Sequence, residues 1–315
     1  MTTEMEPRFS LPSETPLSSK KELVIGGVRI YIYGLEELHR GENERIAVLY
    51  LAHNRTRTYL VTEGIAHEVL HRYRADGRQK TAQLIAVTMN MRNHGDREIS
   101  PRANRTWKDG NENHGVDLLS MISGSAQDFK LVMDYLPAYL PEYAQLYNIM
   151  AGVSLGGHTA WRMAALAPGQ FHAFAMIVGS PNLRSLLLSR LGLNSTTDHS
   201  QLDYDGMSYE DLHGIMRPRQ QRMWPRTLDK IIGEGDRKAF EEFPTGVPLL
   251  LCNGKYDKLV PAKYTASWVE KRKQSNNIEF FVQDNTGHSC TKEMVSMLAR
   301  WLSDMFQVQS GMAHI

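Results

Sequence analysis

One serine in this chain of 315 residues lies among three glycines, in the sequence GVSLGGH from Gly152 to His158. The apolar run YNIMA precedes it, and the stretch LGGHTAWRMAALAPG has the pattern of a helix that ends at Pro168. The G-x-S-x-G pattern on a sharp strand-to-helix turn is typical of a nucleophilic serine, because glycines remove Cβ atoms that would clash there. We therefore predict that Ser154 is a nucleophile. A phosphate-binding turn is disfavoured, because the stretch lacks the G-x-G-x-x-G spacing and the lysine of a phosphate loop.

A nucleophilic serine needs a base, and the base needs an acid that orients it. Asp257 follows the predicted strand in VPLLLCNGKYD, and His288 follows the predicted strand in IEFFVQDNTGH. This is the chain order serine, acid, histidine that accompanies the serine turn in sheets with parallel strands. Asp284 is the rival acid, and each of the two loop residues could instead have only a structural role. Four other histidines precede or adjoin the serine, which excludes them as the base: His53, His94, His114 and His158.

The negative charge that forms during attack on a carbonyl needs N–H donors. The backbone N–H of Leu155 begins the predicted helix, where free amides favour an anion. A second donor is expected from the loop AHNRTRT, which follows the strand RIAVLYLAH. Arg55 is the first candidate and Asn54 is its rival, while the alternative is a loop that only connects two elements.

Predicted strands and helices alternate through most of the chain, which indicates an α/β fold with a mostly parallel sheet covered on both faces. The strands are expected at 22–34 (two strands around a Gly-Gly turn), 45–53, 83–91, 147–152, 171–180, 247–257 and 278–288. The helices are expected at 64–77, 125–140, 155–169, 267–274 and 291–306.

The interval from Pro181 to Pro244 has no clear strand and is far longer than an ordinary connection. We predict three parts: a flexible N-terminal segment over 1–21, a core made of 22–180 and 245–315, and a helical cap inserted at 181–244.

The composition indicates which kinds of partner and which compartment are expected for the protein. The formal net charge is +1 and no long basic stripe is present, so nucleic acid is not favoured. No stretch approaches the roughly 20 apolar residues of a membrane span, and the N-terminus lacks the apolar centre of a signal peptide. Two cysteines, Cys252 and Cys290, suggest no disulfide framework, so we expect a cytoplasmic protein.

Together, GVSLGG at Ser154, NGKYDKLVP at Asp257 and NTGHS at His288 resemble the α/β-hydrolase superfamily, most of all its dienelactone-hydrolase and prolyl-oligopeptidase side. The resemblance covers about residues 22–306. It implies an eight-stranded sheet, a serine esterase mechanism and no cofactor or metal. Asn54 departs from the family, whose members often carry glycine at this position. RNHG, residues 92–95, is similar to a loop common after the fourth strand of such proteins.

The expected function is a serine hydrolase that cleaves a small-molecule carboxylic ester or thioester. Acyl transfer, carbon–carbon bond hydrolysis and non-catalytic ligand binding are alternatives on the same scaffold, and nucleotide binding is disfavoured. Apolar side chains of the predicted cap suggest a substrate with an apolar group, unless they only hold the cap on the core. These side chains are Leu186, Leu187, Leu188, Leu191, Leu193, Met207, Met216, Met223 and Trp224.

Overall fold

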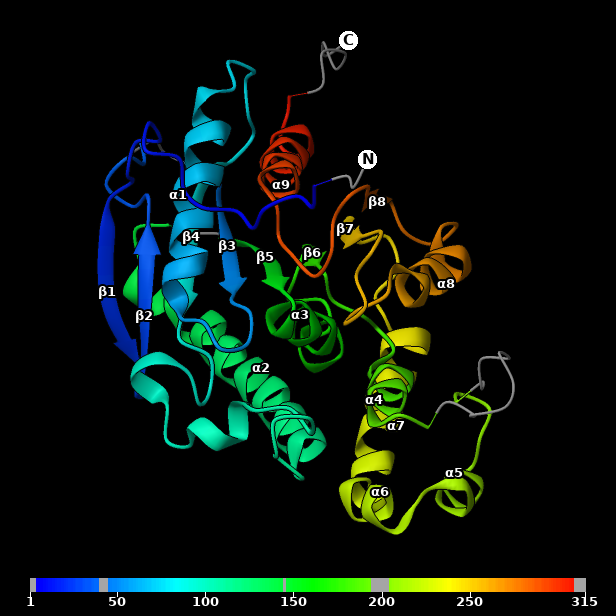
Figure 1. Cartoon of the computed structure of the whole chain (residues 1–315). Coiled ribbons are helices and arrows are strands. Elements are labelled where there is room, and N and C mark those ends of the chain that lie inside the picture. Colours follow the sequence, from blue (N-terminus) through cyan, green and yellow to red (C-terminus); the bar gives the residue numbers. More distant parts are fainter. Residues whose placement is uncertain (1–3, 40–44, 144–145, 194–203, 309–315) are drawn as a thin grey trace.

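A single eight-stranded sheet organises the chain (Figure 1). The computed structural model describes residues 4–39, 45–143, 146–193 and 204–308. The strand order is β1-β2-β4-β3-β5-β6-β7-β8, in which β1, β2 and β4 pair antiparallel and all later pairs are parallel. The predicted α/β class with a mostly parallel sheet is confirmed. The strands are β1 (Lys20–Ile25), β2 (Val28–Tyr33), β3 (Ile46–Ala52), β4 (Gln83–Met89), β5 (Leu146–Val153), β6 (Ala173–Ile177), β7 (Leu249–Gly254) and β8 (Ile278–Gln283).

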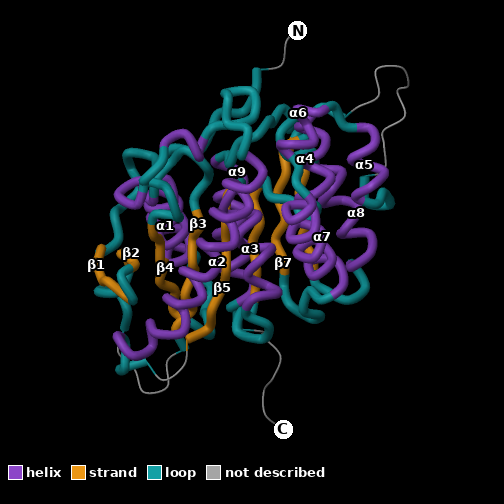
Figure 2. Tube along the Cα trace, turned by 90° about the horizontal axis from the view of Figure 1, so that it is seen from below, coloured by secondary structure: helices purple, strands orange, loops and turns teal. Residues whose placement is uncertain are grey.

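Helices flank the strands along the sheet (Figure 2). The helices are α1 (Tyr59–Ala75), α2 (His114–Tyr139), α3 (Leu155–Leu166), α4 (Leu183–Leu191), α5 (Tyr209–Ile215), α6 (Pro218–Met223), α7 (Arg226–Glu241), α8 (Ala262–Arg272) and α9 (Lys292–Met305). Two separate apolar clusters show which helices cover each face of the sheet. One cluster joins the sheet to α1 and α9, and the other joins it to α2, α3, α7 and α8. Both faces are therefore buried, which explains why all seven residues of β3 are apolar and buried.

Helix α2 begins at His114, which is 11 residues before the start that we predict. Gly115, Gly124 and three serines weaken the helical signal of this stretch, because glycine and serine are poor helix formers. Leu118 and Ile122 nevertheless pack into the core, so tertiary contacts stabilise the first turns.

Four helices, α4 to α7, occupy the interval between β6 and β7 and gather at the side of the molecule opposite the β1–β2 hairpin (Figure 1). Part of the predicted cap, 194–203, lies outside the described residues. Helix α7 packs on α3, where Arg162 and Asp236 form an ion pair of 2.8 Å. The boundaries 181–244 stay a prediction, and α7 lies against the helix layer that covers the sheet.

The apolar side chains of this insertion point mostly into the core. Of the nine cap side chains that suggested a substrate with an apolar group, seven are buried in the main apolar cluster. None of the nine lines the cavity described below. They hold the insertion on the sheet, as the alternative reading of the sequence had it. The seven are Leu186, Leu187, Leu188, Leu193, Met216, Met223 and Trp224.

The N-terminal segment makes specific contacts that its composition did not suggest. The Glu6 N–H donates to the Asn285 carbonyl and the Phe9 N–H donates to the Cys290 carbonyl, each at 2.7 Å. Further along, Thr15 donates its hydroxyl proton to the buried Glu68 carboxylate of α1 at 2.6 Å. Residues 4–19 therefore lie across the loop before α9 and along α1.

No helix among the described residues combines the length and the apolar character that a membrane span needs.

Candidate active site

Ser154 lies between the end of β5 and the first residue of α3, with φ 56° and ψ −108°. This conformation is rare for a residue with a side chain, and it is stabilised by close backbone packing. A Cβ atom at Gly152 would overlap the Gly156 carbonyl, and one at Gly156 would overlap the Ala52 carbonyl. At Gly157 a Cβ atom would lie 3.0 Å from the Gly179 Cα atom. The three glycines are therefore required by the close approach of β3, β5 and the loop after β6 to the start of α3.

The structure brings Ser154, His288 and Asp257 into one hydrogen-bonded chain. Ser154 Oγ lies 2.7 Å from His288 Nε2, and His288 Nδ1 lies 2.7 Å from Asp257 Oδ2. The Asp257 side chain is 0 % exposed, while that of His288 is 21 % exposed. The N–H groups of Leu259 and Val260 both donate to Asp257 Oδ1 at 2.8 Å, so the carboxylate has partners on both oxygens.

The rival acid points elsewhere. Asp284 has a side chain that is 73 % exposed, and it pairs with Lys255 at 2.6 Å on the surface. Asp257 follows β7 and His288 follows β8, its neighbour in the sheet, so parallel pairing brings the two loops together. The Tyr256 N–H donates to the Thr286 carbonyl at 2.9 Å and joins these loops directly.

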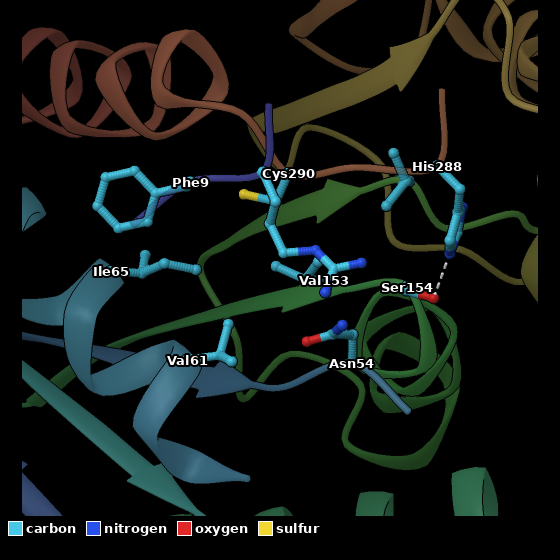
Figure 3. A pocket seen from close by; sticks show the side chains of 10 residues that line it. Phe9, Asn54, Val61, Ile65, Val153, Ser154, His288 and Cys290 are labelled. Carbon is cyan, nitrogen blue, oxygen red and sulfur yellow. Dashed lines mark hydrogen bonds between the residues drawn. The ribbon is translucent and has the colours of Figure 1, made fainter. Parts of the chain in front are cut away.

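The loop after β3 reaches the start of α3. The Gly156 N–H donates to the His53 carbonyl at 3.1 Å, and Asn54, Arg55 and Leu155 all line the cavity next to Ser154. Asn54 also lines a narrow cleft beside Ser154, where its Oδ1 atom is buried without a hydrogen-bond partner among the described residues (Figure 3). Both loop candidates for the oxyanion donor therefore lie beside the serine.

His53 holds this loop in place, a role that the sequence analysis missed. Its Nε2 accepts from the Met91 N–H at 3.0 Å and its Nδ1 lies 2.8 Å from the Asn54 carbonyl. Burial lowers the pKa of His53 to about 3, so the ring is neutral. A neutral ring with its proton on Nδ1 satisfies both bonds and joins the loop after β3 to the loop after β4. Its position directly after the strand and before Asn54 was the available signal.

The other three histidines that chain order excludes are also buried. Burial lowers the pKa values of His114 and His158 to about 3 and also lowers that of His94. His158 Nδ1 lies 3.1 Å from the Ser180 carbonyl, and the His94 ring packs edge-on against His53.

The segment from Arg92 to Asn113, before α2, is tied to the core by ion pairs and hydrogen bonds. Arg92 and Arg97 both bond the buried carboxylate of Asp128 on α2, at distances from 2.7 to 3.0 Å. Trp107 is buried, donates its indole N–H to the Glu112 carbonyl at 3.2 Å and lines the cavity. It is both a packing anchor and a part of the cavity wall.

Ser154 and His288 open into a cavity of about 590 Å³, a size typical of small-molecule sites. Its wall comes from the N-terminal segment at Arg8, the loops after β3, β7 and β8, the loop before α2, the first residues of α2 and α3, and the end of α4. Nowhere in the described part of the chain do three or more His, Cys, Asp or Glu side chains gather in a way that could hold a metal ion. Cys252 and Cys290 are free and buried.

Comparisons with known proteins agree with this architecture. Residues 37–310 match the model of the Esterase family, described as "Putative esterase". TT1662 from Thermus thermophilus superposes with a TM-score of 0.63 at 16% identity, covering 93% of this chain and 99% of that one. Est1E from Butyrivibrio proteoclasticus, solved with ferulic acid, superposes with a TM-score of 0.52 at 13% identity, covering 90% of this chain and 97% of that one. The esterase Pf2001 from Pyrococcus furiosus superposes with a TM-score of 0.51 at 13% identity, covering 96% of each chain. No curated protein matches the chain.

At these identities the solved structures show the fold, and the family model covers most of the chain. The resemblance to the α/β-hydrolase superfamily that we infer from the three motifs is confirmed, and its dienelactone-hydrolase and prolyl-oligopeptidase side stays a prediction. The chain belongs to the Esterase family and is an ester-cleaving hydrolase of the α/β-hydrolase superfamily.

Proposed function

We propose that the protein is a serine hydrolase that cleaves a small-molecule carboxylic ester or thioester through an acyl-enzyme intermediate. The observation that carries this proposal is the chain of two 2.7 Å contacts from Ser154 through His288 to Asp257. Nucleophile, base and orienting acid lie within hydrogen-bond reach of each other, which is the geometric requirement for activating a serine.

In the first half of the reaction, His288 takes the Ser154 proton while Oγ attacks the carbonyl carbon of the substrate. Asp257 holds the imidazole with its proton on Nδ1 and stabilises the charged ring that forms. The Leu155 N–H and an N–H of Arg55 or Asn54 donate to the oxyanion. The charged His288 then protonates the leaving alcohol or thiol, and Ser154 remains acylated.

In the second half, His288 takes a proton from water, and the hydroxide attacks the acyl-enzyme. The tetrahedral intermediate collapses, the acid leaves and Ser154 regains its proton from His288. The partial exposure of His288 supports this step, because water can reach the ring from the cavity.

The cavity supports a substrate with an apolar part. Its apolar wall consists of Trp107, Leu118, Leu155 and Leu259. Such a wall favours a carbon skeleton placed next to the ester, since apolar surface is removed from water on binding. None of these four residues belongs to the interval 181–244, so the apolar contact would come mainly from the core.

Labelling with a fluorophosphonate probe tests the proposal. The intact protein is expected to incorporate the probe, and Ser154→Ala and His288→Ala are expected to lose it. Ser296→Ala is the matched control, because Ser296 lies on the exposed side of α9 and donates only to the Lys292 carbonyl. If the folded wild type does not react, Ser154 is not an activated nucleophile and a ligand-binding role for the scaffold takes precedence.

A further inference from the structure

The cavity next to Ser154 carries a concentrated positive charge. Its described lining contains six lysines and arginines and no Asp or Glu. The whole chain is nearly balanced, with 36 Lys and Arg against 35 Asp and Glu. The separation of charge is therefore a property of this cavity. The six residues are Arg8, Arg55, Arg57, Lys108, Arg190 and Lys258.

More than half of the described lysines and arginines outside the cavity have a carboxylate within 4.0 Å, although some, such as Arg272, bond only backbone carbonyls. Arg219 and Arg226, on the inserted helices α6 and α7, pair with Glu112 and Glu210 on the surface. By contrast, no described carboxylate lies within 4.0 Å of any of the six cavity cations. None of the six forms an ion pair, and the Asp109 and Asp257 carboxylates act on Arg55 and Arg190 only from beyond ion-pair distance.

Arg55 and Arg190 are the two partly buried members of the group. Arg55 donates to the Asn104 carbonyl at 2.6 Å, and Arg190 donates to the Leu259 carbonyl at 3.2 and 2.5 Å. A backbone carbonyl orients a guanidinium group but does not cancel its charge. Each guanidinium has five N–H donors, so several remain for another acceptor.

The positive charge of Arg55 also acts on Arg190. Burial, together with the positive charge of Arg55, lowers the pKa of Arg190 to about 10, and the Asp257 carboxylate opposes this only in part. Partly buried like charges near one another cost free energy unless an anion lies close to both. This arrangement beside Ser154 therefore favours the binding of a negatively charged ligand.

We propose that the substrate is an anionic ester, whose acyl or alcohol part carries a carboxylate or phosphate group bound by Arg190 and Arg55. This inference rests on the function proposed above and adds the charge of the substrate to it. The planar guanidinium matches both oxyanions with paired N–H donors. Lys258, Lys108, Arg57 and Arg8 are exposed and attract the anion toward the cavity, while the apolar wall contacts the carbon skeleton.

The first test compares two esters with the same six-carbon acyl chain, 4-nitrophenyl hexanoate and the 4-nitrophenyl monoester of adipic acid. The readout is the ratio of kcat/KM for the charged ester to that for the neutral ester. At low ionic strength the Arg190→Gln variant is expected to lower this ratio by about tenfold or more, through KM, since a hydrogen bond to a charged group is lost. In the wild type, added salt should lower the rate for the charged ester selectively.

Two variants control this test. Arg190→Lys keeps the charge but loses the paired donors, so it should lower the ratio less than Arg190→Gln does, which separates lost charge from damaged packing. Lys130→Gln removes a cation on α2 that pairs with Asp134 outside the cavity, and the ratio should not change. An equal ratio in wild type and Arg190→Gln, without selective salt dependence, would overturn the proposal even if both esters are cleaved.

The second test does not require turnover. Ser154→Ala is titrated calorimetrically at low ionic strength with adipate and, separately, with inorganic phosphate. Binding to Ser154→Ala that disappears in the double variant Ser154→Ala, Arg190→Gln supports the anion site. This holds even if neither ester is cleaved by the wild type, because a lack of cleavage would count against the esterase proposal alone. The stronger of the two anions identifies the group that the site prefers. The absence of binding by both anions would refute the anion site.

Discussion

At Asp257, each carboxylate oxygen has its own partners. Oδ2 accepts from His288, and Oδ1 accepts from two backbone N–H groups of its own loop. The side chain is fully buried, so its orientation is fixed by these bonds and not by solvent. Asp284, four residues before the histidine, has none of these constraints and lies on the surface.

Replacing Asp257 with asparagine should therefore lower kcat by roughly three to four orders of magnitude, because the amide favours the wrong tautomer of His288. Asp284→Asn is the matched control and should keep kcat within about twofold, because a surface ion pair contributes little. Both variants are measured with a 4-nitrophenyl ester at pH 7.5. Similar losses in the two variants would reject Asp257 as the orienting acid.

Gly156 offers a prediction on stability. A methyl group there would overlap the Ala52 carbonyl, which belongs to a rigid strand. Gly156→Ala is expected to destabilise the protein by about 3 kcal/mol, since overpacking against backbone cannot relax by a side-chain rotation. At Gly233 on α7 an added Cβ atom meets nothing within 4 Å, so Gly233→Ala should be neutral or stabilising by up to about 1 kcal/mol. Urea unfolding distinguishes the two, and equal midpoints would contradict the packing argument.

The three residues of the proposed triad could be identified from the sequence because each carries a local signal. Ser154 has its glycines, and Asp257 and His288 each follow an apolar strand in the expected order. The local signal of His53 is limited to its position directly after a strand, and Arg8 has none. Their positions beside the site depend on contacts with residues far away in the chain, Met91 for His53 and the His288 loop for the N-terminal segment.

Among the elements, the inner parallel strands were predicted well because they form short apolar runs, and β3, β6 and β7 are buried on both faces. The prediction of α2 was too short because glycine and serine conceal its first turns. The inserted helices were predicted from the absence of strands and from two stretches that look helical, LRSLLLSRLGL and YEDLHGIMRPRQQRMWPRTLDKII. Periodicity reports that a helix has an apolar face but not which surface covers that face, so the contact between α7 and α3 could not be inferred.

The N-terminal segment gives a prediction at this scale. It bonds Asn285 and Cys290, one on each side of His288, and Phe9 and Arg8 line the cleft beside Ser154 (Figure 3). Deleting residues 2–14 should lower kcat/KM by about ten- to a hundredfold, because a small misplacement of a reacting group is costly. Deleting residues 2–4 removes none of these contacts and is the control. If the longer deletion retains full activity while folded, the segment does not position the His288 loop.

For the molecule as a whole, three buried histidines lead to a pH prediction. The pKa values of His53, His114 and His158 are lowered by burial to about 3, so these rings stay neutral in the folded chain. In the unfolded chain each binds a proton below about pH 6.5. The unfolded state then holds more protons than the folded state, and stability is lost as pH falls from about 6.5 toward 3, by up to about 1.4 kcal/mol per pH unit for each histidine.

Urea unfolding at pH 7, 6 and 5 measures this slope above the range in which most carboxylates titrate. His53→Gln should reduce the slope, whereas His39→Gln, on an exposed loop, should leave it unchanged. A midpoint that does not vary between pH 7 and pH 5 would show that the buried histidines do not control acid stability.

The packing around Ser154 has a practical consequence. The serine takes its strained conformation only when β3, β5 and the loop after β6 have all closed on the start of α3, so its reactivity is a property of the assembled sheet. A covalent probe that reacts with Ser154 would then label only the natively folded molecules, at one site in each. In a cell extract, probe incorporation would report the fraction of this protein that has reached its native state, without purification and without knowledge of its natural substrate.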